Sequence, residues 1–178
     1  MASRKTRRKN LIQLLSLVIA VVVVVLCSIA FQSWWNNRPG PEPNTVTITV
    51  SSGDVSQDIT PFSVCEPGVP CDENEVPSIA VDKDGELKIS VPKEVSDHDW
   101  SLLKIYDDPA ANDQSFFGAN EATEATVAGS VDPVRKKDDK RPRLVVAEVT
   151  SVLIGHDDQG VETPYTVTWS VFGKVIGV

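Results

Sequence analysis

Residues 143–154 read RLVVAEVTSVLI and residues 165–172 read YTVTWSVF, and these two segments decide the fold. Both are rich in β-branched and aromatic residues, which favour strands. In the second segment every other residue is apolar: Tyr165, Val167, Trp169 and Val171. We expect these four to enter the core, and the Thr and Ser residues between them to face solvent or to lie beneath another strand. The connecting residues 155–164 contain Asp and Gly, which predicts a long hairpin loop.

The same alternation with a period of two appears upstream in the chain. Thr45 to Val50 (TVTITV) predicts a strand, and Trp100 to Tyr106 predicts another that is buried on both sides or carries a bulge. Val76 to Val81 and Glu86 to Val91 flank the tetrapeptide Asp-Lys-Asp-Gly, whose Asp and Gly residues favour a tight turn. We therefore expect these last two segments to form a β-hairpin.

Residues 110–131 are the least strand-like part of the chain, and we expect a short helix or an ordered loop there. They contain Phe116 and Phe117, and the sequence leaves open whether these side chains fill the core or form a contact. Residues 135–143 (RKKDDKRPR) predict a solvated loop, because two aspartates interrupt the basic run.

The short strands and the turn signals between them indicate an all-β domain. We expect an antiparallel β-sandwich with immunoglobulin-like topology, and a small β-barrel is the alternative. It does not look like an antibody domain, because Cys65 and Cys71 are too close in sequence to bridge two sheets. About 130 residues lie beyond the N-terminal apolar segment and the Pro-rich linker that follows it. This length is enough for one domain and too short for two sizeable cores.

The N-terminal segment predicts a transmembrane helix. Five cations precede Leu11: Arg4, Lys5, Arg7, Arg8 and Lys9. The apolar run from Leu11 to Phe31 is long enough to cross a bilayer, and Trp34 and Trp35 at its end are typical of the membrane interface. The basic flank favours a cytoplasmic N-terminus. The chain then divides into a cytoplasmic basic tail (1–10), a transmembrane helix (11–35), a Pro-rich linker (36–44) and an extracytoplasmic domain (45–178).

Two alternatives compete with a retained anchor. Ser28 and Ala30 form the small-x-small pattern that signal peptidase reads, which would release the chain after Ala30. A lipoprotein signal ending at Cys27 would place the bulky Leu26 before the modified cysteine, and this argues against it. The apolar character continues past Ala30 to the two tryptophans, which favours a helix that stays in the membrane.

The charge is strongly asymmetric along the chain. Five of the 17 Lys and Arg residues precede Leu11, which leaves 12 of them against 25 Asp and Glu in the remainder, a net charge of −13. Such a domain should repel nucleic acid and anionic lipid headgroups, so neither is an expected partner. The simplest interpretation is that the acidity keeps an exported domain soluble. A more specific interpretation is that the negative charge attracts a cationic partner or divalent cations.

Cys65 and Cys71 enclose five residues, among which Pro and Gly favour a tight loop that brings the two sulfurs together. We expect a disulfide there, on the oxidising side of the membrane. A redox pair or a metal site is the weaker interpretation, because redox motifs typically use two-residue spacing and metal sites need further ligands. Cys27 is expected to be a small lipid-facing or packing residue.

Candidates for chemistry are few. His98 and His156 each lie beside aspartates, and a zinc or hydrolytic site would need their two turns to converge with a further nucleophile or ligand. Paired acids at 107–108, 138–139 and 157–158 could hold calcium, but consecutive side chains diverge in extended chain, which favours simple loop polarity. No phosphate-binding loop, zinc-protease motif or hydrolase motif is present. We therefore expect no catalytic residue, no metal and no cofactor.

Two segments carry a family resemblance: VPKEVSDHDWSLLKIYDDP at 91–109, and RPRLVVAEVTSVLIG with ETPYTVTWSVF within 141–172. They resemble an uncharacterised actinobacterial family of exported or membrane-anchored envelope proteins, defined by a domain of unknown function (family 2771). The resemblance covers most of the domain and implies a compartment and a lineage, with no assigned active site. Several such proteins look like peripheral subunits of larger membrane machines, and the actinobacterial cytochrome bcc–oxidase respiratory supercomplex is one assembly that would accommodate one.

Our leading hypothesis is a non-enzymatic accessory subunit of a membrane complex, which docks through its transmembrane helix and its acidic domain. The alternative is a free-standing envelope protein that binds a lipid, a glycan or a cell-wall component between its sheets. An exported hydrolase is a third hypothesis, and it would need His98 or His156 within hydrogen-bonding reach of a Ser or Asp in a cleft.

Overall fold

The computed structural model describes residues 4–36, 40–134, 140–157 and 159–176. The chain divides into two compact units, residues 1–39 and residues 40–178. The first unit contains helix α1 (Arg4–Asn36), which continues beyond both ends of the predicted span 11–35. Its segment Leu15–Trp34 has a mean hydropathy of 2.7, and among the described helices it alone is long and apolar enough to cross a membrane. A signal sequence near the N-terminus has the same character, so this property fits both a retained anchor and a cleaved signal.

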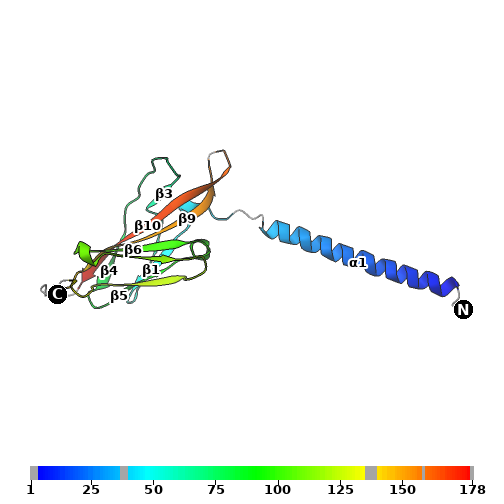
Figure 1. Cartoon of the computed structure of the whole chain (residues 1–178), viewed down its shortest axis with the longest axis horizontal. Helices are drawn as coiled ribbons and strands as arrows, with labels where there is room; N and C mark the ends of the chain where they lie inside the picture. The colour runs from blue at the N-terminus through cyan, green and yellow to red at the C-terminus, as the bar shows by residue number, and fades with distance from the viewer. Residues whose placement is uncertain (1–3, 37–39, 135–139, 158, 177–178) are drawn as a thin grey trace. The chain divides into compact units, whose positions relative to one another are not determined.

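The second unit is built from two β-sheets, as Figure 1 shows. The smaller sheet has the order β2-β1-β5-β8, with β1 Ile48–Ser52, β2 Val55–Ile59, β5 Glu86–Ser90 and β8 Glu124–Ala128. The larger sheet has the order β3-β10-β9-β6-β7, with β3 Ser63–Cys65, β6 Trp100–Tyr106, β7 Asp113–Phe117, β9 Leu144–His156 and β10 Glu162–Ile176. Strand β4 (Ser78–Asp82) joins the larger sheet by pairing with β10. Three short helices complete the described elements: η1 (Pro43–Thr45), α2 (Lys93–Ser96) and η2 (Pro109–Ala111).

The long hairpin of β9 and β10 confirms the strand pair predicted from the sequence. Trp169 lies opposite Val149 in the register, and Val167, Trp169 and Val171 are fully buried while Tyr165 is partly buried. Both strands run further than expected, so the loop between them spans only residues 157–161. For β6 the sequence left burial on both sides or a bulge as alternatives, and the structure shows an irregularity of the bulge type, because the register with β9 shifts between Ile105 and Tyr106.

The core lies between the two sheets and is filled by their inward-facing side chains. Trp100 stacks on Phe117 with ring centroids 4.1 Å apart, and its indole Nε1 donates to the carbonyl of Ala122. The Tyr106 hydroxyl donates to the carbonyl of Ala128, and burial, with a smaller contribution from Asp113, raises the pKa of this phenol. No buried side-chain nitrogen or oxygen of the described residues lacks a hydrogen-bond partner. The buried polar side chains of the described core therefore find their hydrogen-bond partners within the chain.

The predicted hairpin of residues 76–81 and 86–91 is wrong. Strands β4 and β5 do not pair with each other: β4 runs parallel to β10 in the larger sheet, and β5 pairs with β1 and β8 in the smaller one. The turn at 82–85 has the expected tight geometry, with the Gly85 amide donating to the carbonyl of Asp82. Alternating apolar residues predict two half-buried strands but do not distinguish a hairpin from a crossing between sheets. All other strand pairs in the described chain are antiparallel, as predicted.

The expectation of a short helix or loop over residues 110–131 is also wrong in its main part. Apart from the short turn η2, this segment supplies the edge strands β7 and β8. An edge strand is paired on one side only and buries few side chains, so its sequence lacks the apolar alternation of a central strand. Phe117 packs against the core, whereas Phe116 is 74% exposed.

Candidate functional site

The two histidines lie in different settings, and each has its Nδ1 next to an oxygen of a glutamate. His98 follows α2, and its Nδ1 lies 3.0 Å from the carbonyl of Glu94. His156 ends β9, and its Nδ1 lies 3.3 Å from Oε1 of Glu42, a residue just before η1. Within the described residues no group of three or more His, Cys, Asp and Glu side chains is arranged to hold a metal ion. The structure therefore does not bring the predicted hydrolase or zinc candidates together.

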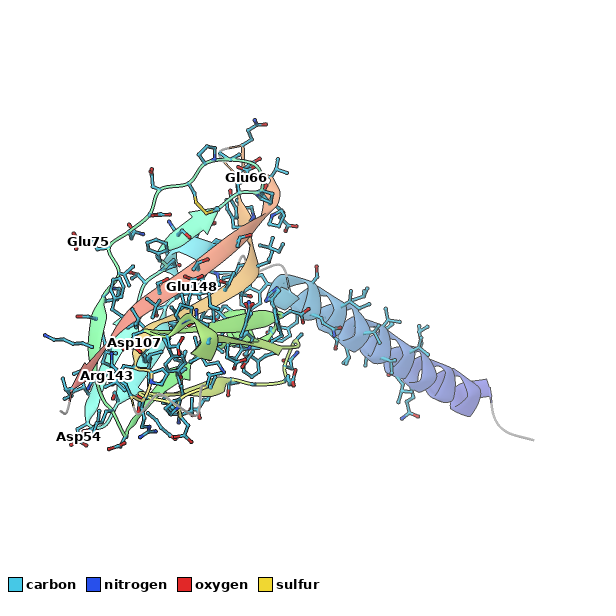
Figure 2. The ribbon with its side chains drawn as sticks, turned by 60° about the vertical axis from the view of Figure 1, so that its left-hand side comes forward. Asp54, Glu66, Glu75, Asp107, Arg143 and Glu148 are labelled. Carbon is cyan, nitrogen blue, oxygen red and sulfur yellow. A yellow bond between two sulfur atoms is a disulfide. The ribbon has the colours of Figure 1, made fainter. Side chains whose placement is uncertain are left out.

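The paired acids serve the backbone around them. Asp107 accepts from the amide of Arg143 and from Nζ of Lys140, and Figure 2 shows Asp107 beside Arg143. The Arg143 amide is the main cause of a lowered pKa at Asp107; slight burial opposes it and Lys140 adds to it. Asp108 caps η2 by accepting from the amide of Ala110. The pair 138–139 and residue 158 lie outside the described residues.

Asp157 likewise organises the loop between β9 and β10. Its Oδ1 accepts from the amides of Gln159 and Val161, both at 2.8 Å. A carboxylate that accepts two main-chain amides replaces the ladder bonds that the loop lacks. The described acids of all these pairs thus have structural partners, in keeping with the interpretation as loop polarity.

Cys65 and Cys71 form a disulfide with their Cα atoms 5.1 Å apart. Cys65 ends β3, the strand that pairs with β10, and the loop turns at Gly68, whose φ of 80° suits glycine. The bond therefore closes a small loop at the edge of the larger sheet. The third cysteine, Cys27, is a free and exposed residue of α1.

The predicted membrane-interface pair is described only in part. Trp34 is exposed at the end of the apolar span, and its ring centroid lies 6.0 Å from that of Phe31. The side chain of Trp35 lies outside the described part of the chain. Their role at a membrane interface stays a prediction.

Two hollows adjoin Tyr165 near the end of the β9–β10 hairpin. One has a volume of about 270 Å³ and is lined by Glu66, Asp157, Gln159 and Tyr165. The other, of about 280 Å³, is lined by the following residues: Glu42, Pro43, Asn44, Val64, His156 and Tyr165. The Tyr165 hydroxyl donates to the carbonyl of His156, and carboxylates dominate the first hollow. These hollows contain acids but no nucleophile with a base beside it.

The outer face of the larger sheet, which points away from the core, is the strongest candidate site. Large apolar side chains are exposed there, in contrast to the filled core beneath: Phe116 (74%), Ile154 (53%), Val152 (48%) and Phe172 (45%). Between them the face carries hydroxyl residues and Glu148, which accepts from the hydroxyl of Ser170 and is labelled in Figure 2. Phe116 and Val152 line one hollow, and grouped apolar residues on an exposed face mark contact surfaces more often than isolated ones do.

One end of this face is hollowed into an apolar groove of about 340 Å³, which we call the β6–β7 groove. Its lining includes the following residues: Asp99, Trp100, Phe116, Phe117, Gly118 and Val152. The groove exists because β6 begins at Trp100, opposite Ser151, while β9 continues to His156. Sequence reasoning did not identify this groove, and the only signal for it was the Phe116–Phe117 pair in a polar context.

Comparison with known proteins gives a family without an assigned function. A family model described as "Protein of unknown function (DUF2771)" matches residues 41–174. Uncharacterized proteins of Mycobacterium bovis and Mycobacterium tuberculosis are 26% identical over 158 residues, which cover 85% of this chain and 92% of theirs. No solved structure matches.

Proposed function

Because the chain belongs to the DUF2771 family, whose description assigns no function, we propose a function from the chain's own architecture. The protein is a non-enzymatic, single-pass membrane protein that acts as an accessory subunit of a larger membrane complex. One observation carries this proposal: α1 exposes its whole apolar span, while the β-sandwich fills its own core and exposes apolar side chains on one sheet face. Both units thus offer a surface that a partner can cover.

The finer features of the proposal have separate support. The five cations before Leu11 favour a cytoplasmic N-terminus, and the Cys65–Cys71 disulfide fits an oxidising compartment for the domain. The mycobacterial relatives support an actinobacterial lineage. The cytochrome bcc–oxidase supercomplex is one assembly that would accommodate such a subunit, and family-level analogy is its support.

We infer further that the sandwich is immunoglobulin-like. In variable immunoglobulin domains one sheet contains strands G, F, C and C′ side by side, and the other contains A, B and E. Here β10, β9, β6 and β7 are neighbours in the first order, and β1, β5 and β8 in the second, which supports the inference. An experimental structure in which β6 does not pair with β9 would contradict it.

The test of the accessory-subunit proposal is purification of the tagged full-length chain from its own membranes in a mild detergent. We expect it to co-purify with defined subunits at constant stoichiometry across successive columns. The matched control replaces residues 11–31 by leucines and keeps the basic flank and the Trp pair, so that anchoring is preserved while the helix surface changes. A monomer without co-purifying subunits would end the proposal. Equal recovery with both chains would show that the helix is only a tether.

The alternative function is a free-standing envelope protein that binds a lipid, glycan or wall component. In its original form this requires a cavity between the sheets, and the buried side chains that fill that space count against it. The β6–β7 groove gives it limited support, because an apolar hollow with aromatic walls can hold a small ligand. Soluble glycan or lipid probes that shift the amide resonances of Phe116 and Val152 in the isotope-labelled chain would favour this alternative.

A further inference from the structure

We propose that the β6–β7 groove is the surface on which the domain docks a protein partner, and that this partner presents an apolar side chain flanked by Lys or Arg. This inference rests on the proposed function, because it names the surface by which the accessory subunit meets its neighbour. It is argued from the shape and apolar lining of the groove and from the charges around it.

The lining of the groove supplies the apolar part of the argument. Phe116 projects from edge strand β7 with 74% of its surface exposed, and Val152 on β9 is 48% exposed. Trp100 and Phe117 also contribute to the lining, and their rings stack against each other on the core side of the sheet, where Trp100 is only 2% exposed. Burying a phenylalanine side chain removes apolar area from water and stabilises a complex, and rigid aromatic anchors are typical of interface hot spots. The groove is therefore shaped for one inserted apolar side chain.

The charged groups at the groove are all acidic in the described residues. Asp99 lines it, and the Oδ1 atom of Asp99 accepts from the amide of Ala119 at 2.9 Å. Glu121 lies at the same end, where its Oε2 accepts from the amide of Gly118, itself a lining residue, at 2.7 Å. These main-chain bonds hold each carboxylate in place, and its second oxygen can still accept from an incoming cation. Two positioned carboxylates beside an apolar hollow complement a basic rim around an apolar anchor.

The net charge distinguishes between the occupants of this surface. The chain after residue 10 carries 12 Lys and Arg against 25 Asp and Glu, a net charge of −13. A second copy would bring the same net charge to the contact, and an anionic lipid surface would be repelled in the same way. A cationic protein surface gains from both the local carboxylates and the overall field.

The experiment is site-specific photocrosslinking in native membranes. The full-length chain carries p-benzoylphenylalanine at Val152, and a control chain carries it at Val55, an exposed residue of β2 in the other sheet. We expect the Val152 probe to crosslink one protein through a peptide whose apolar residue has Lys or Arg neighbours. Asp99→Asn, which keeps the Oδ1 acceptor, should lower the yield about threefold, and the effect should shrink as salt rises.

A second pair of variants distinguishes specific binding in the groove from nonspecific hydrophobic association. Phe116→Ala should lower the yield of the Val152 probe roughly tenfold, because it removes the exposed wall of the groove. Val55→Ala, at an exposed residue of β2 in the other sheet, should leave the yield unchanged. All variants are compared by circular dichroism to show that the fold is retained.

Several outcomes would overturn the inference. One is a crosslink from Val152 to a second copy of the chain, to lipid alone or to a peptide without basic residues. The others are an unchanged crosslinking yield in Asp99→Asn and the absence of any crosslink at Val152. If defined subunits still co-purify while the Val152 probe gives no crosslink, the groove inference fails and the proposed function stands. If nothing co-purifies, the proposed function itself fails.

Discussion

The indole Nε1 of Trp169 donates a hydrogen bond to the main-chain carbonyl of Val46, 2.9 Å away and 123 residues earlier in the chain. Trp169 belongs to the central strand β10, and Val46 is the buried residue that follows η1. The bond therefore fastens the start of the domain, where the chain leaves the linker, to the middle of the larger sheet. Because both groups are buried, water cannot replace the bond if it is lost.

We predict that Trp169→Phe lowers the free energy of unfolding by about 2–4 kcal/mol, from the unsatisfied Val46 carbonyl and the lost ring volume together. Urea denaturation of the full chain in detergent, followed by circular dichroism of the β-sheet signal, measures this loss. Trp100→Phe is the matched control. The Trp100 indole donates to the only partly buried carbonyl of Ala122, so we expect a smaller loss there. A larger loss at Trp100 would contradict the assignment.

A second prediction concerns two glycines at close contacts. A Cβ at Gly129 would clash with the main-chain oxygen of Asp82, whereas a Cβ at Gly155 would lie 2.7 Å from Cδ of Pro43. Backbone cannot move as easily as a side chain, so Gly129→Ala should destabilise the domain more than Gly155→Ala, which should cost about 1–3 kcal/mol. Gly40→Ala, with no atom within 4 Å of the added carbon, should change little.

The same denaturation series contains an internal test of the Gly155 contact. If the clash is with the Pro43 ring, Pro43→Ala should recover part of the stability lost in Gly155→Ala, and the two effects should be non-additive. Strict additivity would place the strain elsewhere. Equal stability of the Gly129 and Gly155 variants would contradict the backbone argument.

A third prediction is that the disulfide stabilises its own corner of the sheet. Closing a loop of about seven residues corresponds to about 2 kcal/mol in the chain-entropy estimate. Reduction should therefore lower stability by at most this amount and speed hydrogen exchange in β3, while the amides of β9 stay protected. Uniformly faster exchange in every strand would show that the bond supports the whole domain.

The oxidation state of the same two cysteines can be tested in intact cells. An alkylating label should react with Cys65 and Cys71 only after reduction, as the expected oxidising compartment requires.

The extent to which the sequence predicts this structure differs between central and edge strands. Val167, Trp169 and Val171 alternate with polar residues because the sheet has one core face, and the strand, its partner and its buried residues were all predictable from that pattern. Phe116 and Phe117 form no such pattern, since β7 is an edge strand in which burial depends on neighbours far along the chain. Which sheet a strand joins, as with β4 and β5, depends on tertiary packing alone.

The candidate site was less predictable than the fold. No residue pattern in the sequence linked the histidines to the paired acids, and the structure places His98 beside Glu94 and His156 beside Glu42. The β6–β7 groove depends on where β6 begins relative to β9, a relationship that no local motif records. Asp99 and Glu121 are brought to it by two main-chain amides in one turn, so their common position is a product of the fold.

A last prediction follows from the Asp107 carboxylate, which joins the end of β6 to the start of β9. Its pKa is lowered below the ordinary value of 3.8, mainly by the Arg143 amide, partly opposed by burial and assisted by Lys140. A group with a lowered folded-state pKa adds stability above its unfolded pKa, and this is lost as pH falls through the folded value. The Asp107 contribution should therefore be present above about pH 4 and disappear below it.

Asp107→Asn should be less stable than the parent chain at neutral pH, and urea denaturation curves of the two should converge in acid. Asp54→Asn, at an exposed turn labelled in Figure 2, is the control for the same change of side chain at a position away from the β6–β9 junction. A gap between Asp107→Asn and the parent that does not narrow in acid would refute the link between this carboxylate and acid stability.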